Sequence, residues 1–198
     1  MLYTIAHWLR AHCNWMWEVA EDMNSVAFGM RYRKPLRRIE AVIADYAKVR
    51  VAVPADAERL ALFFDKQPES AFEFFRPHAF DEETLSKLIG RKSFLMFVVE
   101  EEGVIVGYFF LRSFVHGVCY LGKMVDHEHQ GQGIGKRMCK AAMDVAVTLG
   151  LRMFESINRN NMASMRSTGA VLKQVVLEEL EHGDLLLEDL PLEDPRGS

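Results

Sequence analysis

A glycine-rich segment is the part of the sequence whose residue types and spacing could do chemistry. Gly131, Gly133 and Gly135 alternate with other residues, and an apolar stretch that ends at Val125 precedes them. Glycine lets backbone amides approach a ligand without a side chain in the way. A helix that begins after such a loop adds unpaired amides and the positive end of its dipole. The segment therefore predicts a site for a phosphate or diphosphate group.

Two common phosphate-binding motifs do not fit this segment. The dinucleotide fingerprint requires a third glycine at the position that Lys136 occupies. The Walker phosphate loop requires Ser or Thr after its lysine, whereas Arg137 follows Lys136. Both classes of nucleotide site are therefore excluded.

The segment resembles the acyl-CoA loop of the GNAT superfamily of N-acetyltransferases. The family motif is Gln or Arg, two residues, Gly, one residue, then Gly or Ala, and Gln130, Gly133 and Gly135 match it. The order of expected elements over residues 49–190 is also similar to the family's order. The resemblance implies a mixed α/β fold with a mostly antiparallel central sheet flanked by helices. It also implies acetyl-CoA as the co-substrate.

The resemblance further implies which residues hold coenzyme A. The backbone of Met124 and Val125 is expected to pair with the pantetheine arm as an added strand would. The amides expected at the pyrophosphate belong to Gln130, Gly131, Gln132, Gly133, Ile134, Gly135 and Lys136. Asn160 or Asn161 corresponds to a family asparagine that faces the cofactor. Asn161 is preferred because it lies four residues after Ile157.

The chain departs from the family where many members carry a tyrosine that protonates the leaving thiolate. Residues 161–170 contain no tyrosine, and their hydroxyl groups belong to Ser164, Ser167 and Thr168. Such hydroxyls are poor acids, but a thiol with a pKa of about 8.5 leaves readily as a thiolate. The reaction therefore does not require a protein acid.

Transfer to an amine also requires a group that accepts a proton. Glu155 and Tyr120 are the expected candidates, and His116 is a further one. Glu155 lies in a buried strand pattern, where an isolated carboxylate is costly unless it is functional or paired. Tyr120 lies on the strand expected to line the cleft, although strand tyrosines often belong to the core.

Two further groups of residues are of types that could bind an acceptor or a metal ion. The aromatic connector 72–78 lies where family members shape the acceptor pocket, which makes Arg76 and His78 candidate acceptor contacts. His127 and His129, with the acids beside them, resemble metal ligands, but no second well-spaced Cys/His pair completes a tetrahedral site. We therefore expect no metal.

The composition limits the class of protein. The chain has 198 residues, a formal net charge of −4 and a pI near 6.0, which disfavours an electrostatically driven nucleic-acid binder. Three widely spaced cysteines, Cys13, Cys119 and Cys139, favour reduced thiols and a cytoplasmic location over a disulfide scaffold.

The patterns along the chain predict a helical extension (1–48), an acetyltransferase domain (49–190) and a flexible tail (191–198). In the extension, apolar residues at helical spacing predict a helix over 5–27 that ends at Gly29, and a second helix over 36–46. We expect the first helix to pack on the domain or on a second subunit, as in a homodimer, and expect no firm membrane association.

The domain itself predicts alternating strands and helices. The expected strands are 49–53, 94–100, 104–114, 118–125, 153–157, 175–180 and 185–190. The expected helices are 57–65 after a cap at Asp56, 82–89 after a cap at Asp81, 133–148, and a short one after Asn161. This order predicts a mixed α/β domain.

These residues together predict an enzyme that transfers an acetyl or other acyl group directly to an amine of a small molecule. An amino sugar or an amino acid derivative is a candidate acceptor. Two alternatives stay open at this point: a non-catalytic module that binds coenzyme A, and an enzyme that acetylates protein amines.

Overall fold

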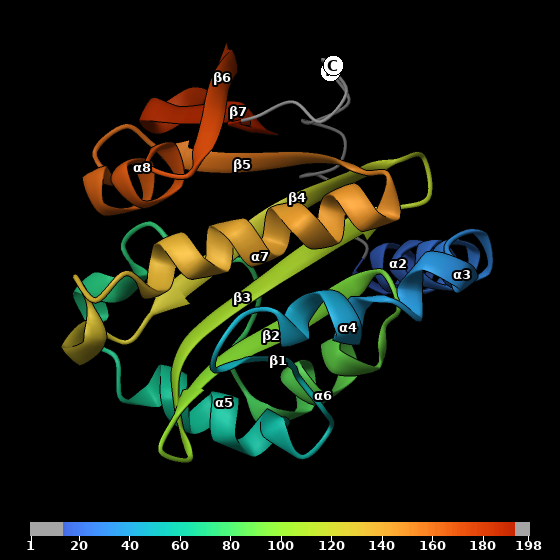
Figure 1. Ribbon diagram of the computed structural model, residues 1–198. Helices are drawn as coiled ribbons and strands as arrows, with labels where there is room; N and C mark the ends of the chain where they lie inside the picture. The colour runs from blue at the N-terminus through green and yellow to red at the C-terminus, as the bar shows by residue number, and fades with distance from the viewer. Residues whose placement is uncertain (1–13, 193–198) are drawn as a thin grey trace.

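The computed structural model describes residues 14–192 and contains one seven-stranded sheet of strand order β1-β2-β3-β4-β5-β7-β6 (Figure 1). Its strands are β1 Val49–Val51, β2 Phe94–Glu101, β3 Val104–Phe114, β4 Val118–Val125, β5 Arg152–Asn158, β6 Leu172–Glu179 and β7 Asp184–Pro191. All neighbouring strands are antiparallel except β4 and β5, which are parallel. The predicted mixed, mostly antiparallel sheet is confirmed.

Helices cover both faces of this sheet. They are α2 Asn14–Arg31, α3 Arg33–Leu36, α4 Ile39–Ala44, α5 Asp56–Asp65, α6 Glu82–Gly90, α7 Ile134–Leu149 and α8 Met162–Gly169. Side chains alternate between the two faces of a strand. On β3, Phe109 and Leu111 join the core under α4 and α7, whereas Tyr108 and Phe110 join the core of α5 and α6. No helix of the described part is long and apolar enough to cross a membrane.

The two parallel strands separate soon after they begin. β4 pairs with β5 only at Val118, Cys119 and Tyr120. Beyond Tyr120, β5 stays paired with β7 as far as Asn158, whereas β4 continues to Val125 beside β3 alone. The sheet is therefore split into two parts, and one edge of the second half of β4 faces the split.

The first described helix differs from its prediction in two ways. It runs past Gly29 to Arg31, and the predicted part before Asn14 lies outside the described residues. Gly29 is needed for close packing, because a Cβ there would lie 2.5 Å from the Cδ of Lys92. Met16 and Met23 of the predicted apolar face are exposed and do not pack on the domain, so packing of this face on a second subunit stays a prediction.

The predicted second helix, 36–46, is in fact two short helices. α3 ends at Leu36, Arg37 and Arg38 form a turn, and α4 begins at Ile39. Pro35 fits inside α3 because a four-residue helix requires no amide from it. The turn directs Ile39 and Ile43 into the core beneath α7, where both are buried.

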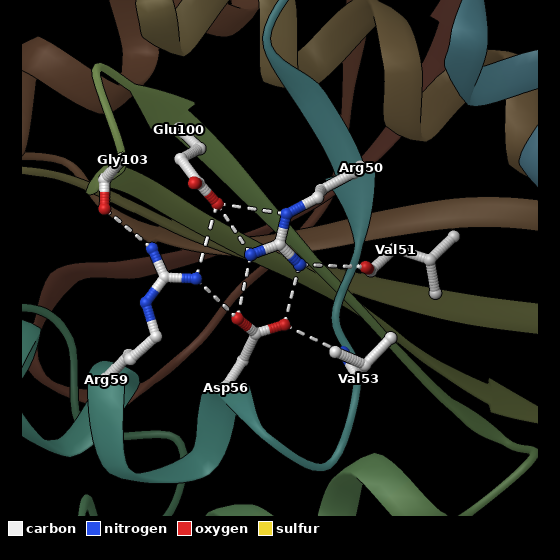
Figure 2. Close-up of polar contacts among 7 residues, drawn as sticks. All are labelled: Arg50, Val51, Val53, Asp56, Arg59, Glu100 and Gly103. Carbon is white, nitrogen blue, oxygen red and sulfur yellow. Dashed lines mark hydrogen bonds and ion pairs between the residues drawn. The ribbon is translucent and has the colours of Figure 1, made fainter.

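Asp56 is also not the helix cap that the sequence predicts. α5 begins at Asp56 itself, after Ala55, and no side chain caps it. The Asp56 carboxylate is instead buried against two arginines, as Figure 2 shows. Arg50 donates to both of its oxygens, at 2.6 and 2.7 Å, and Arg59 donates at 2.9 Å. Glu100 also accepts from Arg50, so this cluster ties β1, α5 and β2 together.

Asp56→Ala is expected to lower the free energy of unfolding by about 2 kcal/mol, because two guanidinium groups lose their shared carboxylate. Burial alone raises the pKa of Asp56, but the hydrogen bonds from Arg50 and the Val53 amide and the charges of Arg50 and Arg59 together outweigh it and hold that pKa below its usual value. The stabilisation is therefore lost as pH falls through the pKa of the folded state. Urea unfolding tests this, with Asp65→Ala at the exposed end of α5 as the control.

Candidate active site

A cavity of about 560 Å³ lies where β4 separates from β5. The glycine-rich loop and the start of α7 form one wall, and α8 forms another. The turn before α6 contributes Ser70, Ala71, Phe74 and Phe75 at a further side. The cavity therefore joins the loop predicted to bind phosphate to the aromatic connector predicted to shape an acceptor pocket.

The loop presents open backbone to this cavity. Gly131 and Gly133 have positive φ values of 78° and 81°, and no atom lies within 4 Å of a Cβ placed on either. Gly133 is the N-cap of α7, so the amides of Ile134, Gly135 and Lys136 belong to the first turn of that helix. The first turn of a sixteen-residue helix has amides without intrahelical acceptors.

None of the backbone amides from Gln130 to Lys136 donates a hydrogen bond to another described residue. The first amide of this region with an acceptor is that of Arg137, which donates to the Gly133 carbonyl. Lys136 and Arg166 also line the cavity, and neither has a carboxylate within 4 Å among residues 14–192. Free amides beside two unpaired cations suit a diphosphate.

The open edge of β4 lies along the same cavity. Met124 and Val125 pair through their other edge with Tyr108 and Gly107 of β3. Their cavity-facing edge has no strand partner in the described chain, because β5 has already separated. An extended ligand could therefore add to β4 as a strand would.

Asn161 lines the cavity at the start of α8, whereas Asn160 does not. The Asn161 side chain caps α8 by accepting a hydrogen bond from the Ser164 amide at 3.1 Å. This cap uses its oxygen and leaves its amide nitrogen available to a ligand. Ser164 and Ser167 also line the cavity, and the Ser167 hydroxyl donates to the Ser164 carbonyl at 2.9 Å.

Glu155 lines the cavity but is paired inside the protein. Its carboxylate lies 2.5 Å from the Lys123 ammonium and accepts a hydrogen bond from the Thr168 hydroxyl at 3.1 Å. Lys123 also donates to Thr168 at 2.8 Å. Burial lowers the pKa of Lys123, but several smaller contributions, the charge of Glu155 first among them, together raise it by more, so this pKa lies above its usual value. Lys123 is therefore charged at neutral pH and forms an ion pair with Glu155.

A second buried carboxyl, Asp189, lies near this pair. Neither of its oxygens has a hydrogen-bond partner in the described structure. Burial raises its pKa to about 8, and the charge of Glu155 adds to the rise, whereas the charge of Lys123 opposes it. Asp189 is therefore mostly protonated at neutral pH, which leaves Lys123 and Glu155 to balance each other.

Stability is expected to fall as pH rises, because of Asp189. The pKa of Asp189 is raised in the folded state. The stabilisation that Asp189 contributes is therefore complete below its unfolded pKa of about 4 and is lost as pH rises through about 8. The slope is about 1.4 kcal/mol per pH unit in that window. Asp189→Asn should flatten this slope in urea unfolding between pH 5 and 9. An unchanged slope would assign it to other groups.

Besides Gln132 and Asn160, four predicted site residues lie outside the cavity lining. Tyr120 is on β4 before the split and contacts Phe114 and Phe154. His116 lies in the turn beyond β3. The remaining two are Arg76, which is exposed and donates to the Phe72 carbonyl, and His78, whose Nε2 is 2.9 Å from the Tyr108 hydroxyl. Their predicted roles would therefore require movement of the connector or of the acceptor.

The sequence did not single out Lys123, Arg166 or Ser70 as cavity residues. Lys123 follows buried Cys119 and Leu121 at steps of two along β4 and therefore shares their face of the strand. This spacing could have placed Lys123 on the α7 side of the sheet, beside Glu155. Arg166 lies two residues after the predicted Ser164 but carried no motif. No group of three or more metal-ligating side chains occurs within residues 14–192.

Comparison with known proteins identifies the same region. The sequence matches the family described as Acetyltransferase (GNAT) family over residues 60–167, which is more than half of the chain. None of the curated proteins matches the sequence significantly.

Several solved structures share the fold. The GNAT domain of S. lividans PAT is 18% identical, with a TM-score of 0.61 over 72% of this chain and 89% of that one. The putative acetyltransferase yncA from Salmonella typhimurium, solved with acetyl-CoA, is 24% identical, with a TM-score of 0.53 over 74% and 94%. AAC(6')-Ib, solved with an aminoglycoside and acetyl-CoA, is 11% identical, with a TM-score of 0.58 over 73% and 93%.

Proposed function

The chain belongs to the GNAT family of acetyltransferases, and on that premise we propose that it transfers an acetyl group from acetyl-CoA directly to an amine of a small molecule. The observation that carries the proposal is the run of unoccupied amides from Gln130 to Lys136 beside the open edge of β4. We further propose that residues 49–190 form the catalytic domain and residues 1–48 a helical extension.

The loop and β4 supply two different contacts to acetyl-CoA. The free amides, together with Lys136 and Arg166, would bind the pyrophosphate through charge-assisted hydrogen bonds. The backbone of Met124 and Val125 would pair with the amides of the pantetheine arm. The amide nitrogen of Asn161 would add a donor at the α8 side. These contacts fix the thioester, whose carbonyl the acceptor amine attacks.

Glu155 is the better placed of the two proposed bases. It is the carboxylate among the cavity residues, whereas Tyr120 lies outside the lining. Lys123 and Thr168 hold the Glu155 carboxylate in one position, which favours proton transfer through a fixed geometry. A water molecule between Glu155 and the amine would complete the path, because the carboxylate is almost fully buried.

Direct transfer is favoured over an acyl-enzyme. Neither Cys119 nor Cys139 lines the cavity. Burial raises the pKa of Cys119 to about 12 and raises that of Cys139, so neither thiol forms the nucleophilic thiolate readily. Cys13 lies outside the described residues.

The acceptor is proposed to be a small amine with an apolar part and little positive charge. Phe74 and Phe75 face the cavity, and the carboxylate in the lining, Glu155, is already paired with Lys123. A polycation would find no free carboxylate there. AAC(6')-Ib shares the fold but was solved with aminoglycosides, which are polycations, so its acceptor class is not carried over. Neutral amino sugars and amino acid derivatives fit better.

A thiol-release assay with acetyl-CoA tests the proposal. We expect turnover with aromatic amines, amino acid derivatives or neutral amino sugars, and weaker turnover with kanamycin. Binding of coenzyme A without turnover on any amine would instead support a non-catalytic module. Turnover confined to peptides would indicate a protein acetyltransferase. Failure to bind coenzyme A at all would refute both the enzyme and the module.

A further inference from the structure

The acidic residues of helix α2 pair with cations of the domain. Glu18 pairs with Lys87, Glu21 pairs with Arg112, and the Asp22 carboxylate accepts from Arg91 Nε at 2.9 Å. Phe28 is fully buried on the same side. All three acids of the helix are therefore neutralised by cations on α6, directly after α6 and on β3.

The opposite side of α2 is apolar and exposed. Its residues follow at steps of three and four along the helix, and they are Met16, Val19, Met23, Val26 and Met30. Residues at this spacing share one helix face. Met23 and Met30 are 68% and 70% exposed, so nothing in the described chain covers this stripe. A surface helix normally has the reverse arrangement, with its polar face outward.

Basic residues follow the apolar face along the chain and lie at the same helical spacing. Arg33, Lys34 and Arg37 follow Met30 by three, four and seven residues. The helical path is nearly continuous there, because the Tyr32 amide donates to Phe28 at 2.8 Å and the Leu36 amide to Tyr32 at 2.9 Å. None of the three cations has a carboxylate within 4 Å among residues 14–192. An apolar stripe thus runs directly into an unpaired basic segment.

A second cavity lies beside this basic segment. Its volume is about 430 Å³, and Arg33, Arg37, Arg91 and Lys92 line it over an apolar floor that includes Phe94. No carboxylate belongs to the lining. Arg91 is held by Asp22, but the other three cations face the cavity without an ion-pair partner in the described chain. The cavity suits an anionic group attached to an apolar molecule.

A second copy of this chain fits the surface poorly. In a parallel pairing of two α2 helices, Arg33, Lys34 and Arg37 would meet the same cations. In an antiparallel pairing, they would meet the beginning of the other helix, and Glu18 is the first acid of the sequence. Glu18 is already paired with Lys87. Either arrangement leaves the basic segment without an opposite charge.

We propose that this face of α2 and α3, at the right of Figure 1, binds the surface of a bilayer that contains anionic lipid. The stripe from Met16 to Met30 would lie among the acyl chains near the headgroups. Arg33, Lys34 and Arg37 would contact the lipid phosphates, and the second cavity would hold one headgroup. This departs from the sequence-based expectation of no firm membrane association, because the acids counted against it are each paired with a cation of the domain.

Flotation of the full-length protein with vesicles tests the proposal. We expect it to float with vesicles of phosphatidylcholine and phosphatidylglycerol and to stay unbound with phosphatidylcholine alone. Raising the salt concentration should weaken binding, because the charges are at the surface. No flotation with anionic vesicles, or equal flotation with both kinds, would overturn the proposal.

Paired variants test whether binding depends on this face or only on the exposed apolar residues and net charge of the whole chain. Val26→Glu with Met30→Glu should abolish flotation, whereas the equally exposed Val147→Glu with Val176→Glu should not. Reversing Arg33, Lys34 and Arg37 to Glu should weaken binding by at least about tenfold. Reversing Lys66, Lys140 and Lys173 changes the net charge equally and should have a much smaller effect. Equal losses in the two sets would refute a local surface.

Light scattering tests whether a second copy of this chain, rather than a bilayer, covers the apolar stripe. A wild-type dimer that Val26→Glu with Met30→Glu converts to a monomer, without any vesicle binding by the wild type, would assign the stripe to a second copy and overturn the proposal. Retention of coenzyme A binding in all these variants would show that they remain folded.

Discussion

Gly133→Val is expected to weaken coenzyme A binding by about a hundredfold or more. The substitution places a branched side chain where the amides from Gln130 to Lys136 are open to the cavity. It also strains the N-cap of α7, because Gly133 has a φ of 81°. Loss of two charge-assisted hydrogen bonds, at about 1.5–3 kcal/mol each, accounts for this magnitude. Isothermal titration calorimetry with coenzyme A measures it.

Gly103→Val is a matched control for backbone strain. Gly103 also has a φ of 81°, and no atom lies within 4 Å of a Cβ placed on it, but it belongs to the turn between β2 and β3. Both variants should lower the melting temperature to a similar extent. Only Gly133→Val should lose coenzyme A. If Gly103→Val weakened binding equally, strain alone would explain the effect, and the loop would not be the diphosphate site.

The sequence was most informative where local pattern and tertiary structure agree. β3 and β4 have the predicted bounds, and Asp81 caps α6 by accepting from the Thr84 amide. Gly150 ends α7 in the left-handed conformation, as its position after an apolar helix predicts. In each of these, a few neighbouring residues determine the conformation.

Errors occurred where distant contacts decide the conformation. Asp56 has the sequence context of a cap, but Arg50 and Arg59 draw its carboxylate into an ion cluster. Gly29 has the context of a helix end, yet the Lys92 stem requires a glycine inside the helix. Neither arginine nor lysine is near enough in sequence for a local pattern to reveal the contact.

The candidate site shows the same difference between features that local sequence determines and features that distant contacts determine. The loop from Gln130 to Lys136 was identified because its function depends on backbone amides, which a local glycine pattern determines. The partner of Glu155 was not identified, because Lys123 reaches it from another strand across the point where β4 and β5 separate. Burial predicted that Glu155 is functional or paired, and the structure shows the pairing without excluding the function.

Lys123→Met is expected to lower the free energy of unfolding by about 3–5 kcal/mol at pH 8, because it leaves a buried carboxylate without its counterion. Adding Glu155→Leu should recover most of the stability, since paired removal of buried charges is often nearly neutral. Urea unfolding of the wild type and of the two variants at pH 8 measures these differences.

The double variant also tests the proposed role of Glu155 in proton transfer. Because it should fold and still present the amides of Gln130 to Lys136, it separates catalysis from stability. If Glu155 accepts the proton, kcat should fall by about a hundredfold or more while coenzyme A binding is unchanged. A purely structural ion pair would leave kcat and its pH profile unaltered in the refolded double variant. That result would indicate that water or another group beside the acceptor, rather than Glu155, accepts the proton.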